Sequence, residues 1–326
     1  MIATMATGED FATRTEPVRR ELLAYCYRML GSVHDAEDLL QETWLRAWRA
    51  WDGYDPARAS VRTWLYRIAT NVCLSALEQR ARRPLPSGLG AGPDGDPDAP
   101  LVRGEGVPWL QPFPHPEGEP GAADGLRLAL VAALQYLPAR QRAVLVLREV
   151  LDWPVAEAAR ALEMTPAAVN SALQRARARL AATGLREDEV REPAGREERA
   201  LLDRYVAAFR NADLETLRTL LAEDVVLEMP PFLNWYVGPD DYVGFLQRAF
   251  RLRGTDWRMV PIGANGQPAV AAYLCGPDGV HRMHTIQVFT VARGMITRTT
   301  VFQDQELFAA FGLAPVLADE ARPLPG

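Results

Sequence analysis

A cluster of polar side chains within residues 166–180 has the composition of a DNA-reading helix. Its members can reach base edges or phosphates from a helix in the major groove, and they are Asn170, Ser171, Gln174, Arg175 and Arg177. Val169, Leu173, Ala176 and Leu180 recur at steps of four, three and four, so we expect them to face a core. The pattern predicts a helix with one apolar face and one DNA-binding face; a merely solvated basic face is the alternative interpretation.

The residues before this helix complete a helical pair. Pro154 suits the start of a first helix, because a helix does not need the N–H group that proline lacks there. Met164 falls in a short turn. Thr165 is a natural N-cap and Pro166 suits the first turn of the second helix. Residues 154–180 therefore predict a helix-turn-helix.

Charge alternates along the 326 residues although the net charge is only −6. Residues 17–83 carry +3, residues 84–123 carry −5, residues 126–186 carry +5 and residues 187–326 carry −6; every basic residue is Arg. The overall charge gives little reason to expect nucleic-acid binding, whereas the two basic segments do.

Composition argues against several classes of protein. No apolar run reaches membrane-spanning length and no secretory signal is apparent, so we expect a cytoplasmic protein with no membrane partner. Cys26, Cys73 and Cys275 lie far apart and form no CxxC or His/Cys motif. We therefore predict buried cysteines, with no disulfide framework, no metal site and no cofactor.

The N-terminal part predicts three helices after a flexible tail of residues 1–16. The first begins near Pro17 and ends at Gly31, the second spans residues 34–51, and Ser60 caps the third. Arginines beside aromatic residues in the third helix are typical of single-stranded DNA binding. The alternative, which we favour for most of them, is that the aromatic residues form core; they are Trp44, Trp48, Trp51, Trp64 and Tyr66.

Residues 84–123 contain ten Pro and eight Gly and show no apolar periodicity, which predicts a linker. Residues 107–114 include two aromatics and a Leu, so we expect this short stretch to dock on another part of the protein. Residues 124–186 then form a second helical module that ends in the helix-turn-helix.

After a hinge at residues 187–196 the pattern becomes that of an α+β domain. Two helices, a strand, a helix and four more strands are predicted, followed by a short helix from Asp304 to Gly312. The predicted strands are Asp224–Met229, Trp257–Ile262, Val270–Cys275, His281–Val291 and Met295–Phe302.

Three motifs in order resemble a known family. They are DAEDLLQETWLRAW (Asp35–Trp48), VRTWLYRIATN (Val61–Asn71) and the stretch Leu137–Leu180. Residues 17–83 and 124–186 thereby resemble regions 2 and 4 of sigma-70-type factors of the extracytoplasmic-function class. Residues 197–326 are similar to SnoaL-like domains, which are cone-shaped α+β folds. The resemblance implies a multidomain protein with two all-α modules and a C-terminal α+β domain.

The resemblance also implies partners and site residues. The partners would be RNA polymerase core, through the β′ clamp helices and the β flap, and promoter DNA. The residues implied for the clamp helices are Asp38, Gln41, Glu42 and Leu45. Those implied for the −10 element are Arg62, Trp64, Arg67, Asn71 and Arg80. Those implied for the −35 element are Thr165, Asn170, Ser171, Gln174, Arg175 and Arg177. The acidic linker would thread polymerase channels.

For the C-terminal domain we expect regulation by intramolecular contact with the sigma modules or the linker, and no catalysis. Residues 229–238 are the predicted contact segment or pocket rim. The candidate pocket residues are Trp235, Tyr236, Arg282, His284, Gln287 and Asp304. His281 and His284 should not share a strand face, and no carboxylate is evidently paired with either.

Two alternatives from other classes remain open at this point. One is a small-molecule enzyme of the SnoaL-like type with a DNA-targeting helical region. The other is a helix-turn-helix repressor that binds DNA alone, although it would leave the helix at Asp35–Trp48 without a role.

Overall fold

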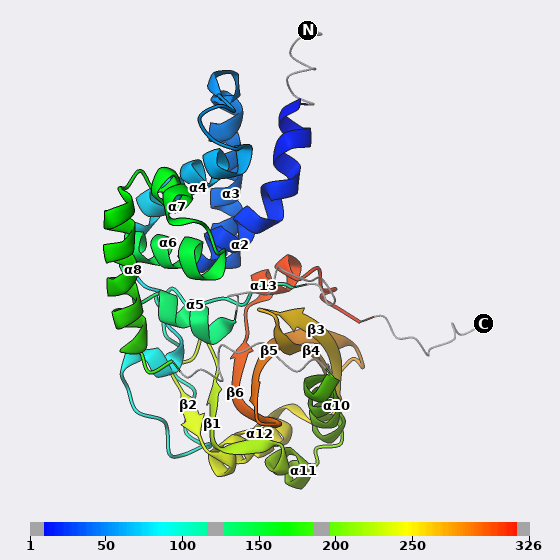
Figure 1. The fold of residues 1–326 in the computed structure, drawn as a ribbon. Coiled ribbons are helices and arrows are strands. Elements are labelled where there is room, and N and C mark those ends of the chain that lie inside the picture. Colours follow the sequence, from blue (N-terminus) through cyan, green and yellow to red (C-terminus); the bar gives the residue numbers. More distant parts are fainter. Residues whose placement is uncertain (1–9, 116–126, 186–195, 318–326) are drawn as a thin grey trace, which may run out of the picture. The chain divides into compact units, whose positions relative to one another are not determined.

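The computed structural model describes residues 10–115, 127–185 and 196–317 (Figure 1). The chain divides into two compact units. One unit combines residues 1–83 with residues 124–186, and the other combines residues 84–123 with residues 187–326. We call residues 17–83 the first helical module, residues 84–123 the linker, residues 124–186 the second helical module and residues 197–326 the C-terminal domain. The predicted hinge lies almost wholly outside the described residues.

The first helical module has the three predicted helices. They are α2 (Arg19–Leu30), α3 (Val33–Arg49) and α4 (Val61–Leu77), with short 3-10 turns η1 (Glu16–Val18) and η2 (Trp51–Gly53). Gly31 ends α2 in the left-handed conformation, and the Ser60 hydroxyl accepts a hydrogen bond from the Thr63 N–H at the start of α4. The expected tail is wrong in part, because residues 10–15 are helical and Phe11 is buried. Apolar burial thus extends the module toward the N-terminus.

The second helical module contains the predicted helix-turn-helix. Its elements are α5 (Leu128–Leu134), α6 (Ala139–Leu145), the π-helical turn η4 (Val146–Val150), α7 (Val155–Ala161) and α8 (Pro166–Ala181). Thr165 caps α8 as predicted, by accepting a hydrogen bond from the Ala168 N–H. Pro154 is itself the N-cap of α7, so that helix begins one residue later than expected. Glu163 adopts a positive φ in the turn between the two helices.

The two helical modules pack against each other within their unit. Trp153 lies against Tyr66 with ring centroids 4.7 Å apart, and the Thr63 hydroxyl donates to the Glu157 carboxylate over 2.8 Å. The buried Arg142 guanidinium donates to the carbonyl of Met29 at the end of α2, and burial lowers its pKa to about 10. These contacts join α7 to α4 and α6 to α2.

The C-terminal domain is a mixed six-stranded sheet with helices. The helices are α10 (Arg196–Arg210), α11 (Leu214–Thr219), α12 (Pro239–Arg253) and α13 (Gln305–Ala310). The strands are β1 (Leu221–Glu228), β2 (Trp235–Val237), β3 (Trp257–Ala264), β4 (Gln267–Cys275), β5 (His281–Ala292) and β6 (Met295–Phe302). The strand order is β2-β1-β6-β5-β4-β3. Only the β1–β6 pair is parallel, which confirms the predicted α+β class.

Helices α10, α11 and α12 supply the apolar side chains that pack on the sheet. Tyr205 and Phe209 of α10 and Phe250 of α12 join Phe289 of β5 in one buried cluster. Strand β2 was not predicted from the sequence, because three residues carry too little alternation to stand out. It pairs with β1 at Val226–Val237. Among the described residues, no helix has both the length and the apolar composition needed to cross a membrane.

We expect Arg142→Met to destabilise the helical unit by about 2–4 kcal/mol, because it leaves several buried carbonyls without a donor. The guanidinium also donates to the Gln135 side chain (2.9 Å) and to the Leu137 carbonyl (3.2 Å). Urea denaturation of the full chain, followed by hydrogen exchange in α2 and α6, measures the loss. Arg140→Met on the exposed side of the same helix is the matched control. Equal stability of the two variants would contradict this account of Arg142.

Candidate nucleic-acid interface and linker-bound cavity

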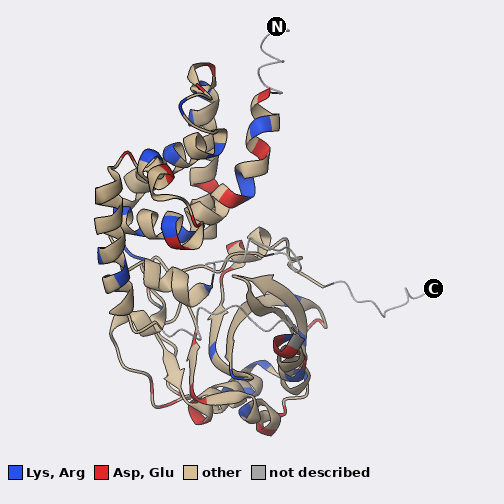
Figure 2. Cartoon of the chain, viewed as in Figure 1, with Lys and Arg blue, Asp and Glu red and all other residues tan. Residues whose placement is uncertain are grey.

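Helix α8 presents the polar face that its sequence predicts. Val169, Leu173 and Ala176 are buried, while the exposed side chains are Thr165, Asn170, Ser171, Gln174, Arg175 and Arg177. Arg175 donates to the Ser171 hydroxyl over 2.5 Å, so these two side chains lie side by side on the exposed face of α8. Arg177 instead pairs with Glu149 at 2.5 Å. Basic positions recur along α8 in Figure 2.

The five residues implied for the −10 element, which lie on α4 or just beyond it, differ in how exposed they are. Arg67 and Asn71 are exposed, and Arg67 lies 4.0 Å from Glu163 of the second helical module. Trp64 is only 8% exposed and packs against Trp51. Arg80, just beyond the helix, forms an ion pair with Asp35 at 2.7 Å.

Arg62 is held by internal contacts. It pairs with Glu21 and lies over the Trp153 ring, with its guanidinium carbon 4.5 Å from the centroid. Burial by itself would lower the pKa of Arg62, but the hydrogen bonds and charge of Glu21 raise it overall. The face of α4 that carries Arg62 and Arg67 therefore touches the second helical module.

Helix α3 exposes the face implied for polymerase. Asp38, Gln41 and Leu45 are exposed, and Glu42 is half-buried and pairs with Arg46 at 2.7 Å. Leu45 is 51% and Trp48 is 42% exposed, which is unusual for side chains of their size. Together with Phe11, Arg19, Gln41 and Trp44 they line a shallow depression.

The described part of the linker, residues 84–115, lies on the C-terminal domain as a strap that includes the 3-10 turn η3 (Pro86–Leu89). Gly104 donates its N–H to the Pro231 carbonyl (2.9 Å), and the Leu233 N–H donates to the Val102 carbonyl (2.8 Å). Further along, the Phe113 N–H donates to the Asn265 side chain (2.8 Å) and the Asn265 N–H donates back to the Phe113 carbonyl (2.9 Å). The prediction that residues 107–114 dock is thus confirmed within this unit.

Charged and polar side chains reinforce the strap. Arg248 of α12 donates to the carbonyls of Pro97 (2.9 Å) and Ala99 (2.6 Å), and Asn234 accepts from the Val102 N–H (2.6 Å). At its start, the Ser87 hydroxyl donates to the buried Glu228 carboxylate over 2.8 Å. The predicted contact segment, residues 229–238, supplies many of these partners.

A cavity of about 170 Å³ lies between α10, α12 and the sheet, and Leu101 of the linker forms part of its wall. Most of its lining is apolar or aromatic. Its polar lining residues are Tyr205, Tyr242, Arg248, Arg253, His284, Thr285, Gln287 and Gln303. Tyr205 donates to Gln287 (3.3 Å) and Tyr242 donates to Thr299 (2.9 Å), and burial raises the pKa of Tyr242 to about 12.

Of the six residues predicted for a pocket, His284 and Gln287 line this cavity. Trp235 and Tyr236 lie on β2, where the Trp235 indole donates to the Ala91 carbonyl of the linker (3.3 Å). Arg282 is exposed and pairs with Asp278 at 2.6 Å. Asp304 caps α13. The alternation of side chains along a strand does not show which of them face an enclosed space.

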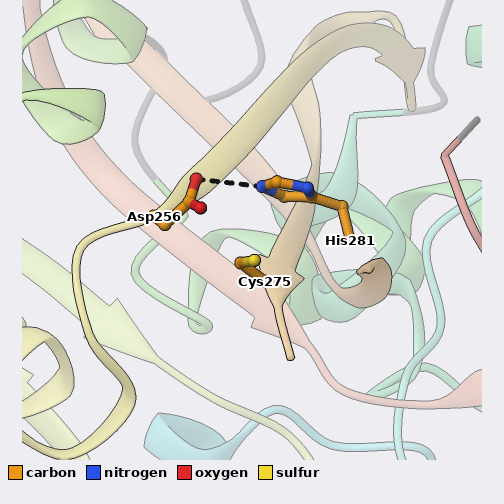
Figure 3. A group of neighbouring side chains, drawn as sticks. All are labelled: Asp256, Cys275 and His281. Carbon is orange, nitrogen blue, oxygen red and sulfur yellow. Dashed lines mark hydrogen bonds and ion pairs between the residues drawn. The ribbon is translucent and has the colours of Figure 1, made fainter. Parts of the chain in front are cut away.

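Asp256, Cys275 and His281 form a row across the ends of β3, β4 and β5 (Figure 3). Cys275 pairs in register with His281, and its N–H donates to the Asp256 carbonyl. His281 Nε2 lies 3.0 Å from Asp256, so the expectation that no carboxylate pairs with either histidine is wrong. The hydrogen bond between the Cys275 thiol and the Asp256 side chain raises the pKa of that thiol. These three ligand types could meet one cation, which the sequence spacing did not reveal.

Comparison with known proteins matches three family models to these parts of the chain. Residues 16–83 match sigma-70 region 2, residues 127–180 match sigma-70 region 4 and residues 202–299 match a SnoaL-like domain.

Similar proteins cover most of the chain. The ECF RNA polymerase sigma factor SigG of Mycobacterium tuberculosis is 47% identical over 93% of this chain and 84% of its own length. The ECF RNA polymerase sigma factor SigJ of Mycobacterium tuberculosis is 32% identical over 81% of each chain. A crystal structure of Mycobacterium tuberculosis SigJ has the same fold, with a TM-score of 0.64, 23% identity and coverage of 93% of this chain and 100% of that chain.

The chain has two all-α modules, the second of which ends in a helix-turn-helix, and then a SnoaL-like domain. This combination defines a sigma-70-type transcription factor. The chain belongs to the extracytoplasmic-function (ECF) RNA polymerase sigma factors. Its function is therefore that of a sigma factor and not that of an enzyme, as the sequence predicted.

We expect acid to destabilise the C-terminal domain partly through His284. Burial, and secondarily Arg253, lower its native pKa to about 4, whereas an unfolded histidine titrates near 6.5. Between these values the unfolded state binds a proton that the native state does not, so stability falls as pH drops from about 6.5 to 4. His284→Gln should reduce this loss, measured by urea denaturation with hydrogen exchange in β5.

His34→Gln, in the first helical module, is the control and should keep the full acid-dependent loss. An imidazole NMR titration of His284 with a midpoint near 6.5 would contradict the prediction.

Proposed function

We propose that this sigma factor brings RNA polymerase core to promoters. Helix α3 and the second helical module would contact the polymerase, and helices α4 and α8 would contact the promoter. Helix α3 would bind the β′ clamp helices through Asp38, Gln41, Glu42 and Leu45, with the exposed Trp48 beside them. The second helical module would also contact the β flap. Exposed apolar side chains on a folded surface are a feature of protein interfaces, which supports this role for α3.

Helices α4 and α8 would contact promoter DNA. The −35 element would meet Thr165, Asn170, Ser171, Gln174, Arg175 and Arg177. The −10 element would meet Arg62, Trp64, Arg67, Asn71 and Arg80. The observation that carries this proposal is the division of α8 into a buried apolar stripe and an exposed Asn/Ser/Gln/Arg face, since those side chains read base edges.

The contact between the helical modules implies an opening step. Arg62 and Arg67 approach Trp153 and Glu163, so one face of α4 is covered while the modules touch. We propose that polymerase binding separates the modules. Each module alone would bind DNA weakly, with a Kd of about 10⁻⁴ to 10⁻⁶ M, and mounting both on polymerase would raise their effective concentration at one promoter.

The C-terminal domain would regulate initiation by holding the linker. A linker that threads polymerase channels must be free to leave its hydrogen-bond partners on α12 and β2. The supporting contacts are those of Arg248 and Asn234 to the linker backbone. The docked linker would then correspond to a less active state of the protein.

We expect Arg175→Ala to weaken promoter binding by polymerase holoenzyme by about 1–3 kcal/mol, roughly 5- to 150-fold, and to relax the preference at one base pair. Run-off transcription with core polymerase on a library of −35 sequences measures both effects. Arg179→Ala, also exposed on α8, should leave the preference unchanged. A uniform loss across all sequences would show that Arg175 contacts phosphate, and an absence of RNA with wild-type protein would overturn the proposed function.

We expect Arg248→Met to raise hydrogen exchange in linker residues 98–102 about 10-fold, because two charge-assisted hydrogen bonds are lost. Run-off transcription at limiting core polymerase should rise with it. Arg204→Met, exposed on α10, is the control. A linker that exchanges faster while transcript yield stays constant or falls would contradict regulation through linker docking.

A further inference from the structure

The cavity of the C-terminal domain has the size of a small-molecule site. Its volume of about 170 Å³ is close to that of apolar protein cavities that hold one benzene molecule. Tyr205, Phe209, Phe245 and Trp257 contribute aromatic surface to its wall. An occupant would therefore be mostly apolar and about one ring in size.

One polar atom in the wall lacks a protein partner. Thr285 is 7% exposed, and its hydroxyl makes no hydrogen bond with any described residue. A buried hydroxyl without a partner is costly and is normally satisfied by a ligand or water. Because Thr285 lines the cavity, an occupant with one hydroxyl or carbonyl group could supply that partner.

The other polar groups of the cavity favour an uncharged occupant. Tyr205, Tyr242 and Gln287 bond to one another or to neighbouring side chains. His284 lies 3.3 Å from Gln303 and is neutral at pH 7, because its pKa is lowered to about 4. Two guanidinium groups also line the cavity: that of Arg248 donates to linker carbonyls, and Arg253 is exposed to solvent.

The linker reaches this cavity through Leu101. Leu101 contributes to the wall and packs on the domain core, and the hydrogen bonds of Arg248 and Asn234 hold the backbone on either side of it. A molecule in the cavity would contact Leu101 only while the linker is docked. By linkage, such a molecule stabilises the docked linker in proportion to that contact.

We propose that the C-terminal domain binds a small, uncharged, mostly apolar molecule that hydrogen-bonds Thr285, and that this binding holds the linker on the domain. The regulatory consequence rests on the proposed function: an occupied cavity keeps the linker away from polymerase. The ligand thus lowers transcription because it stabilises the docked linker.

The test uses phenol as the probe and benzene as its apolar counterpart, both with the full-length protein. Phenol should bind with a Kd on the order of 1 mM, as expected for so few atoms, measured by ligand-observed NMR. Saturating phenol should slow hydrogen exchange in linker residues 98–104 several-fold. Benzene should bind more weakly than phenol, because it cannot pair with Thr285.

Two variants make the test specific. Thr285→Val should weaken phenol about 2- to 10-fold and abolish its advantage over benzene, whereas Thr297→Val, on β6 outside the cavity, should not. Ala249→Phe fills the cavity from α12 and should prevent binding of both probes. Retention of the phenol preference in Thr285→Val, or an unchanged linker exchange at saturation, would overturn the proposal.

The outcomes also separate this inference from the proposed function. Failure of phenol to bind, with Arg248→Met still raising transcription, would overturn the ligand site alone. Binding of phenol that protects the linker, with Arg248→Met leaving transcription unchanged, would support the site and reject linker docking as the regulatory step.

Discussion

The backbone of the linker imposes a constraint on which the second unit of this protein depends. A segment rich in Pro and Gly forms little regular structure, so many of its N–H and C=O groups need partners outside the segment. Here the C-terminal domain supplies several of them through Pro231, Leu233, Asn234 and Asn265. Water or another surface must replace these partners whenever the linker leaves the domain.

The linker also contributes to the cavity of the C-terminal domain, because Leu101 forms part of its wall. In the helical unit, Trp153 and Glu163 of one module contact Arg62 and Arg67 of the other. Under the proposed function, polymerase binding replaces both sets of contacts with its own.

Local features of the chain were predictable because their causes lie within a few residues. The caps at Ser60 and Thr165 and the end of α2 at Gly31 follow from side-chain and backbone preferences alone. Strand β2 and the helix at residues 10–15 were missed because neighbours distant in sequence stabilise them. Of the predicted pocket residues, His284 and Gln287 line the cavity and the others lie elsewhere, since which side of a curved sheet encloses space is not encoded in strand alternation.

By itself, the sequence determined the two helical modules, the linker, the α+β class and the polar face of α8, since helical periodicity, composition and motif spacing act along the chain. Tertiary structure alone decided that Arg62 and Arg80 pair with Glu21 and Asp35, that Asp256 meets His281, and that Leu101 of the linker lines the cavity. Those pairings join residues between 25 and about 150 positions apart, and only the folded packing of the elements brings such groups within hydrogen-bond distance.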